Sequence, residues 1–471
     1  MAANKLKSLI EKFRPRRTYK NGNITTEVDG IFVRIDESMR VREKTLIVPV
    51  EDFLQDAAII RSARVSTGRD AAAVNEKAED LLRSLYKNEH VTPFEGAVLF
   101  RLKMTAPIYA AQPFFQIFSS HNEQSGRYKE IDGQFAIPPW ATKSPQALQI
   151  LREGECDSKR TYEAFLRAGI AKEQARLALL YRFFTKFYWT ISLRHLLELS
   201  ALEENPFAPK EFWEFRDVIL PKLFSDYAPW TNDIFNDSKK CYGTRWAFDI
   251  PYPNAIPYIW KSWIENIGTI KLISSSISED LMRLGVHTGP NPKRGFAHSS
   301  LIFDIACPIF VYRQWVRHRY GAWSELPVDF ARIVKENLFF IPRNFRKQVG
   351  KAMQYRYEDL IGGENERFRD DLALLIKRSC IRYSQLLDLG FSPEQAAIAL
   401  PYSFLVRRLW TVNIESLMNF FSLRCDSEAQ EEIRQFANVI YRWFASRYPW
   451  VNEIFLKHLN YGESPLFNEK K

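Results

Sequence analysis

Residues 162–179 (YEAFLRAGIAKEQARLAL) align without a gap with residues 383–400 (YSQLLDLGFSPEQAAIAL), and this pair of segments decides the fold. Each segment contains one glycine, Gly169 or Gly390, at the point where one helix is expected to end. When many sequence blocks of the first half recur in the same order in the second half, an internal duplication is indicated. Further blocks recur in the same order: 189–192 (WTIS) as 410–413 (WTVN), and 227–235 (YAPWTNDIF) as 447–455 (RYPWVNEIF).

The duplication predicts two tandem copies of one domain. A chain of 471 residues is also longer than one ordinary core requires. We expect the first domain over residues 45–240 and the second over 250–460, with a basic N-terminal extension over 1–44. The proline-rich segment 251–257 (PYPNAIP) is typical of a junction.

The coarse pattern within each copy mixes helices with a short β segment. Residues 74–87 have helical periodicity, and residues 97–104 alternate as a strand does. Residues 144–235 and 344–455 are interpreted as helical throughout. We therefore predict an α+β fold, with a small antiparallel sheet and many helices in each copy.

Composition narrows the class of protein. Hydrophobic residues make up 46% and charged residues 26%, and no run approaches the roughly 20 apolar residues of a membrane span. Residues 1–17 carry charges throughout and show no secretory signal, so we expect a cytoplasmic protein without a membrane partner. The cysteines have no metal-ligand spacing, which predicts reduced thiols and no metal site: Cys156, Cys241, Cys307, Cys380 and Cys425.

The net charge of +10 indicates an anionic partner, either nucleic acid or a phosphorylated small molecule. The basic opening from Lys5 to Arg17 is more typical of a solvated tail than of a binding element.

Two separated stretches each carry half of one motif. Residues 122–128 (NEQSGRY) follow the lead-in APIY at 106–109, and residues 313–319 (RQWVRHR) follow the matching lead-in CPIF at 307–310. Each stretch contains the charged residues that the other copy lacks. This arrangement predicts one site that draws on both copies.

Taken together, the two halves resemble the flavin-dependent thymidylate synthases, which carry an Arg-His-Arg triplet followed by a Ser-x-Arg segment. Arg317-His318-Arg319 is similar to the triplet, and residues 122–128 are similar to the remainder. Other family-like segments are ARVS at 63–66, TPFE at 92–95 and NIESLMNFFSLRCD at 413–426.

The resemblance implies an activity and an assembly. Family members use FAD, reduced by NADPH, to pass a one-carbon unit from methylenetetrahydrofolate to C5 of dUMP. They are homotetramers in which two subunits build each nucleotide site. A chain with two copies is then expected to form a homodimer, a pseudo-tetramer of domains, with one competent site per pair of complementary domains.

The resemblance also implies individual roles. Arg424 and Arg317 are expected to be catalytic. The expected dUMP-binding residues are Glu123, Ser125, Gly126, Arg127, Arg176, Gln314, Arg317 and Arg424. The expected flavin-binding residues are Arg317, His318, Arg319, Asn413, Asn419, Ser66, Thr92 and Arg194.

The groups lost from each copy are those that the other copy keeps. Asp329 stands at the second-copy position of Arg127, and a carboxylate there would repel a phosphate. Ala397 matches Arg176, and Glu203 of the first copy matches Arg424. The first copy has no arginine at residues 112–117. We therefore expect the reciprocal site to be inactive. Two further departures from the family are Glu415, opposite Arg194, and Glu428, where the family usually has histidine.

Other functions stay open at this point. The chain could be a catalytically silent binder of nucleotide or flavin, or a related enzyme that leaves a hydroxymethyl group at C5 of uracil. A protein acting on uracil in nucleic acid would use the net charge of +10, although the motifs favour a small nucleotide.

Overall fold

The computed structural model describes residues 18–33, 56, 59, 60, 63, 77–88, 90, 92–96, 98–117, 119–200, 202, 209–238, 258–264, 267–288, 292–318, 320–350 and 356–458. The described chain divides into two compact units. Unit 1 comprises Met1–Gln124, Phe135–Lys143 and Arg182–Asp249, and unit 2 comprises Ser125–Gln134, Ser144–Tyr181 and Ile250–Lys471. The basic opening at 5–17 and the junction at 251–257 lie outside the described residues.

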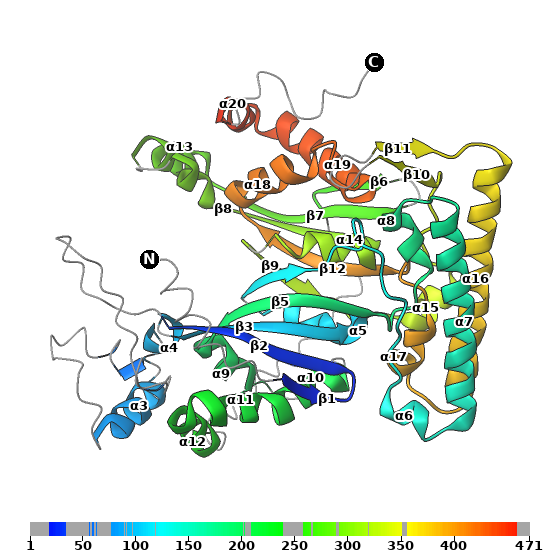
Figure 1. Cartoon of the computed structure of the whole chain (residues 1–471). Coiled ribbons are helices and arrows are strands. Elements are labelled where there is room, and N and C mark those ends of the chain that lie inside the picture. Colours follow the sequence, from blue (N-terminus) through cyan, green and yellow to red (C-terminus); the bar gives the residue numbers. More distant parts are fainter. Residues whose placement is uncertain are drawn as a thin grey trace, which may run out of the picture. The chain divides into compact units, whose positions relative to one another are not determined.

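Unit 1 is built around a five-stranded antiparallel sheet (Figure 1). The strand order is β1 (Thr18–Asn21), β2 (Ile24–Val33), β3 (Val98–Pro107), β5 (Phe184–Ser192), β4 (Ser120–Glu123). The expectation of a separate extension over 1–44 needs correction, because residues 18–33 are two strands of this sheet. The strand 98–107 confirms the β segment expected at 97–104.

Unit 1 also contains helices, several of which pack against its sheet (Figure 1). They are α3 (Lys77–Lys87), α4 (Thr92–Gly96), α5 (Ile108–Ala111), η1 (Pro113–Phe115), α6 (Pro139–Thr142), α9 (Leu193–Ser200), α10 (Lys210–Glu214), η3 (Phe215–Ile219), α11 (Leu220–Tyr227) and α12 (Pro229–Ser238). The core of the unit is aromatic. Phe114 packs edge-on against Trp189, with 5.2 Å between ring centroids, and both side chains are fully buried.

Unit 2 contains a second five-stranded antiparallel sheet with an equivalent strand order (Figure 1). The order is β6 (Trp260–Ile264), β7 (Gly268–Ile277), β8 (Ser299–Pro308), β12 (Leu405–Val412), β9 (Gly321–Glu325). β2 and β7 occupy the same place in their sheets, and each has a register irregularity, at Val28/Gly30 and at Leu272/Ser274.

The helices of unit 2 come from both halves of the sequence. They are α7 (Pro145–Arg167), α8 (Lys172–Ala175), η2 (Arg176–Ala178), α13 (Glu279–Thr288), η4 (Pro292–Ala297), α14 (Ile309–Trp315), α15 (Phe330–Lys335), α16 (Gly363–Asp388), α17 (Pro393–Ala396), η5 (Ala397–Ala399), α18 (Ile414–Arg424), α19 (Glu431–Arg447) and α20 (Pro449–His458). A two-stranded ribbon is formed by β10 (Arg346–Val349) and β11 (Arg356–Asp359).

The two segments that opened the sequence comparison meet inside unit 2. Helices α7 and α16 lie side by side (Figure 1). Beyond them the backbone exchanges hydrogen bonds: Tyr181 N–H donates to Leu400 O at 2.8 Å, and Tyr402 N–H donates to Leu179 O at 2.7 Å. These bonds bring the end of the first repeat's segment into one compact unit with the second repeat.

The expectation of continuous helix over 144–235 and 344–455 is wrong. β5 interrupts the first range, and β10, β11 and β12 interrupt the second. In β12 buried and partly exposed side chains alternate with a period of two, as they do along most of β5. These strands contain large apolar residues at partly exposed positions as well as at buried ones, so their alternation is weak in the sequence.

In the part of the chain that the structure describes, no helix combines the length and hydropathy needed to span a bilayer. The described residues also contain no cluster of three or more His, Cys, Asp or Glu side chains that could hold a metal ion.

Candidate functional site

The segment Ser125–Arg127 forms a tight turn in unit 2. Tyr128 N–H donates to Ser125 O at 3.2 Å, and Arg127 N–H donates to Ser125 Oγ at 3.3 Å. A Cβ atom on Gly126 would lie 3.1 Å from Ile131 Cδ1 and 3.4 Å from Arg176 Cδ. Glycine at this position therefore lets the turn approach the Arg176 side chain closely.

Arg127 is held at two of its guanidinium nitrogens, Nε and Nη1. Nε donates to the Tyr357 hydroxyl at 3.2 Å and lies 2.8 Å from Glu173 Oε2, and Nη1 donates to the backbone carbonyl of Glu428. Burial lowers the pKa of Arg127, but the Glu173 carboxylate and the Tyr357 hydroxyl together more than offset burial, so the pKa is raised and the group stays charged.

A single side-chain oxygen joins residues from the two halves of the sequence. Arg176, in η2, donates from Nη2 to Gln430 Oε1 at 2.9 Å. Gln314, in α14, donates from Nε2 to the same oxygen at 2.8 Å. Gln430 is buried at the start of α19, so these donors sit in fixed positions.

Arg424, the last residue of α18, lies against the second half-motif. Its Nε donates to His318 Nε2 at 2.9 Å, and its Nη2 donates to Gln314 O at 3.0 Å. Burial, and then the charge of Arg424, lowers the pKa of His318 to about 3, so this imidazole is neutral and accepts the hydrogen bond.

Positive charge converges around Arg424. Burial, followed by the charges of Arg317 and Arg127, lowers the pKa of Arg424 to about 10. Arg317 is exposed just beyond α14. Three guanidinium groups that repel one another in this way form a site suited to an anionic ligand.

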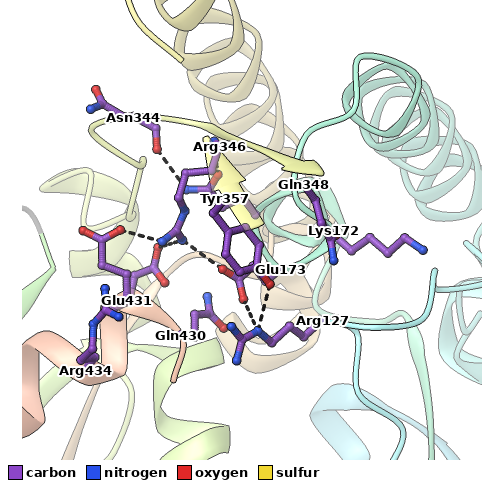
Figure 2. A network of polar contacts seen from close by, with 12 residues as sticks. Arg127, Lys172, Glu173, Asn344, Arg346, Gln348, Tyr357, Gln430, Glu431 and Arg434 are labelled. Carbon is purple, nitrogen blue, oxygen red and sulfur yellow. Dashed lines mark hydrogen bonds and ion pairs between the residues drawn. The ribbon is translucent and has the colours of Figure 1, made fainter. Parts of the chain in front are cut away.

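Next to Arg127 lies a largely buried network of carboxylates and arginines (Figure 2). Arg346 contacts Glu173 Oε1 at 3.2 Å, Glu431 Oε2 at 2.6 Å and Glu432 Oε1 at 3.2 Å. Burial raises the pKa of Glu173, while Arg346 opposes this shift and Glu432 adds to it. The network positions Glu173 beneath the turn that carries Arg127.

The remaining expected residues have varied surroundings. Asn413 caps α18 by accepting from Ser416 N–H at 2.8 Å, and Asn419 is exposed on that helix. In unit 1, Thr92 begins α4 and is exposed. Arg194 pairs with Glu95 at 2.7 Å and Glu198 at 2.9 Å, and Glu123 accepts from the Thr185 hydroxyl at 2.6 Å. Ser66 and Arg319 lie outside the described residues.

The expected site residues can be compared with the residues at the matching positions of the other copy. Phe187 of β5 pairs with Glu123, and Arg408 of β12 pairs with Glu325, which makes the two glutamates equivalent. Four residues further on, Arg127 and Asp329 are equivalent. Asp329 caps α15 by accepting from Arg332 N–H at 2.9 Å. Ala397 is buried, and Glu203 lies outside the described residues.

Sequence reasoning missed the residues that organise the arginines: Glu173, Arg346, Tyr357 and Gln430. Glu173 lies in the repeated segment and matches Glu394 of the second copy. A glutamate that is shared by the two copies does not indicate that one of them contacts a distant arginine. Arg346 and Tyr357 lie on a ribbon that has no counterpart in the corresponding stretch of the first repeat, residues 135–162, which the structure describes in full, so the repeat offers no guide to them.

The fold and the site define a mixed α+β protein of two sheet-containing units, with a cluster of arginines suited to an anionic ligand in unit 2. The family model for thymidylate synthase complementing protein (Thy1) matches residues 50–230 and again residues 260–450. The chain belongs to this family, whose curated relatives include enzymes named flavin-dependent thymidylate synthase.

Two of these relatives illustrate the match. The protein of Aquifex aeolicus is 39% identical over 386 residues, which cover 82% of this chain and 92% of the relative. The protein of Thermosipho africanus is 39% identical over 172 residues, which cover 36% of this chain and 73% of the relative. Among solved structures, the UMP/dUMP methylase PolB from Streptomyces cacaoi, bound with 5-Br dUMP, aligns with a TM-score of 0.38 and 22% identity over 46% of this chain and 96% of PolB.

Proposed function

We propose that this chain catalyses the flavin- and folate-dependent transfer of a one-carbon unit to C5 of dUMP. Family membership and the names of the relatives support the reaction. The observation that carries the proposal is the oxygen of Gln430, which accepts hydrogen bonds from Arg176 of the first repeat and Gln314 of the second. The two repeats thus contribute to one arrangement of donors.

The first repeat supplies the phosphate side of the proposed site. Arg127 and Arg176 provide fixed positive charge, and Ser125 and the backbone around Gly126 provide neutral donors. A nucleotide monophosphate carries the charge and the acceptor oxygens that such a donor set recognises. By resemblance to the family, Glu123, at the end of β4, is also proposed as a nucleotide-binding residue.

The second repeat supplies the base side. Arg424 is held by the neutral imidazole of His318 and by the backbone of Gln314, so its charge is not cancelled by a carboxylate in these contacts. A guanidinium group at a uracil carbonyl would stabilise the negative charge that develops as C5 becomes nucleophilic. Arg424 and Arg317 are therefore proposed as the catalytic residues, and Gln314 as a contact to the base.

The surroundings of His318 and Arg317 fit an anionic, aromatic cofactor such as FAD. The positive charges of Arg317, Arg424 and Arg127 suit its pyrophosphate, and His318 lies edge-on to Phe420 with 4.9 Å between ring centroids. When bound, FAD would supply the redox chemistry, with NADPH as reductant and methylenetetrahydrofolate as one-carbon donor. The residues proposed to hold FAD are Arg317, His318, Arg319, Asn413, Asn419, Ser66, Thr92 and Arg194.

One competent site per chain follows from a tandem duplication, which the equivalent strand orders and the doubly matched family model support. In the proposed organisation, the two copies correspond to the expected domains 45–240 and 250–460, with the strands at 18–33 added to the first copy, and two chains form a homodimer. The second copy's equivalent of the phosphate turn carries Asp329, which caps a helix and opposes phosphate binding.

The test is incubation of the protein with dUMP, methylenetetrahydrofolate and NADPH, followed by mass analysis of the nucleotide. The proposal expects a product heavier by the mass of one methylene group. A product carrying a hydroxymethyl group would identify the related C5-modifying activity. Unchanged dUMP with a protein that cannot be loaded with FAD would favour a silent binder. Salt-dependent binding to nucleic acid would favour an activity on uracil in a polymer.

A further inference from the structure

The ribbon β10–β11 distinguishes the second repeat from the first. Phe135 and Phe339 occupy equivalent places, because each forms an isolated β-bridge, to Phe183 and to Phe404, and each stands two positions before an Ile-Pro pair. Tyr162 follows Phe135 by 27 positions, whereas Tyr383 follows Phe339 by 44, so the second repeat has 17 additional residues there. The ribbon lies within this longer stretch.

The ribbon is fastened to the segment that leads to Arg176. Ala171 N–H donates to Arg346 O at 2.7 Å, and Gln348 N–H donates to Gly169 O at 3.0 Å. Arg346 N–H donates to Gln174 Oε1 at 2.7 Å. Backbone bonds at both ends of β10 fix the ribbon in place, so a side chain on β11 can act on this segment with a defined geometry.

Tyr357, on β11, directs the Arg127 guanidinium (Figure 2). The Nε proton of Arg127 points to the Tyr357 hydroxyl at 3.2 Å. Glu173 Oε2 lies at 2.8 Å from the same nitrogen, yet it is buried and accepts no hydrogen bond. Arg127 and Glu173 therefore form an ion pair without a hydrogen bond. They do not adopt the bidentate arrangement, with two parallel N–H···O bonds, that guanidinium and carboxylate groups often form.

The hydrogen bond from Nε to Tyr357 determines which partners the other two nitrogens of Arg127 can have. Nη1 donates to the Glu428 carbonyl. Nη2 makes no hydrogen bond with any residue in the described ranges. A bidentate pair with Glu173 would use Nη2 together with Nε. The Tyr357 hydroxyl prevents this pair because it accepts the hydrogen bond that Nε donates.

We propose that Tyr357 is a positioning residue for the nucleotide phosphate, which keeps Arg127 Nη2 available by preventing a bidentate pair between Arg127 and Glu173. The inference rests on the proposed function, since it gives the phosphate side of the same site a residue that neither half-motif contains. Arg346 assists by contacting Glu173 Oε1 at 3.2 Å, which holds the carboxylate on its far side.

The test uses the full chain and isothermal titration calorimetry with dUMP. Tyr357→Phe removes the hydroxyl and keeps the ring. Loss of one hydrogen bond to a charged group, together with capture of Arg127 by Glu173, should weaken dUMP binding by about tenfold. Tyr258→Phe is the matched control, because it makes the same chemical change at an exposed tyrosine just before β6 and should leave the dissociation constant unchanged.

A second variant separates positioning from a structural effect. In Tyr357→Phe combined with Glu173→Gln, the side chain at 173 can no longer form an ion pair with Arg127, so dUMP affinity should recover toward that of Glu173→Gln alone. If Tyr357 contributed only to the folding of the ribbon, the dUMP affinity of the double variant would not recover.

The outcomes are distinct. If the unsubstituted protein binds dUMP and Tyr357→Phe binds it equally well, the role of Tyr357 is overturned while the proposed function stands. Independent, additive losses in the double variant also overturn it. If the unsubstituted protein does not bind dUMP at all, the proposed function fails and this inference fails with it.

Discussion

Arg176 and Gln314 lie 138 positions apart in the sequence and donate hydrogen bonds to the same atom, Oε1 of Gln430, at 2.9 and 2.8 Å. Arg176 belongs to the repeat that keeps the Ser-Gly-Arg segment, and Gln314 belongs to the repeat that keeps the Arg-His-Arg segment. Their shared acceptor is buried. The proposed nucleotide site is therefore organised by a residue that lies in neither motif.

Replacing Gln430 should weaken nucleotide binding. Gln430→Ala leaves the Arg176 and Gln314 donors without their acceptor, and loss of a hydrogen bond to a charged group corresponds to about tenfold in affinity. Calorimetric titration with dUMP measures the change. Gln385→Ala, at an exposed position on α16, is the control and should bind dUMP normally. Equal affinity of both variants would remove Gln430 from the site.

The equivalent positions Arg127 and Asp329 should respond in opposite ways. Arg127→Ala removes a charge from the phosphate side and should abolish measurable dUMP binding. Asp329→Ala should leave binding intact but lower the free energy of unfolding by about 1 kcal/mol, because it removes the cap of α15. Urea unfolding and dUMP titration of both variants measure the two effects. Loss of dUMP binding in Asp329→Ala would contradict the proposed asymmetry.

The buried network around Arg346 should be sensitive to loss of its cation. Arg346→Met leaves Glu173 and Glu432 buried without this partner, and breaking a buried ion pair in this way costs about 3–5 kcal/mol. Arg356→Met, at an exposed position on β11, is the matched control and should change stability by less than about 0.5 kcal/mol. Denaturant unfolding curves compare the two, and similar midpoints would show that the network contributes little.

His318 should make stability fall as the pH decreases. Burial, and then Arg424, lowers the pKa of His318 to about 3 in the folded protein, while the unfolded chain takes up a proton near pH 6.5. Between these values the unfolded state binds more protons, so the free energy of unfolding falls by up to about 1.4 kcal/mol per pH unit from this group. His318→Asn should flatten that dependence in unfolding curves measured from pH 7 to 5. An unchanged slope would mean that His318 titrates alike in both states.

The assembly is a further prediction. If two fused domains replace two subunits of a tetramer, the chain should form a homodimer. Light scattering of the purified protein gives the mass directly. A monomer or a tetramer of this chain would contradict the expected arrangement.

Much of the fold could be predicted from the repeat. Two equivalent strand orders agree with the duplicated blocks, and α3, at Lys77–Lys87, lies within the expected helix at 74–87. The sequence predicts helix where β5 and β12 lie, because a strand that is dense in large apolar residues has weak alternation in sequence. The strands at 18–33 were missed because they lie before the region of detectable self-similarity, where no second copy marked them as part of the domain.

The sequence also predicted that Arg127 and Arg176 would be found with Gln314 and Arg424. Complementary loss of charged groups in the two copies was the signal. The partners that fix these arginines could not be predicted in the same way. Tyr357 and Arg346 act through contacts that depend on the ribbon docking against residues 169–174, and no local pattern in the sequence encodes that docking.

The central claim is that the two repeats share one competent nucleotide site in each chain. The stoichiometry of dUMP binding to the full-length protein, measured by calorimetry, tests it most directly. We predict one dUMP per chain, with binding lost in both Arg127→Ala and Arg424→Ala. Two equivalent dUMP sites per chain, or binding that survives either substitution, would contradict the account.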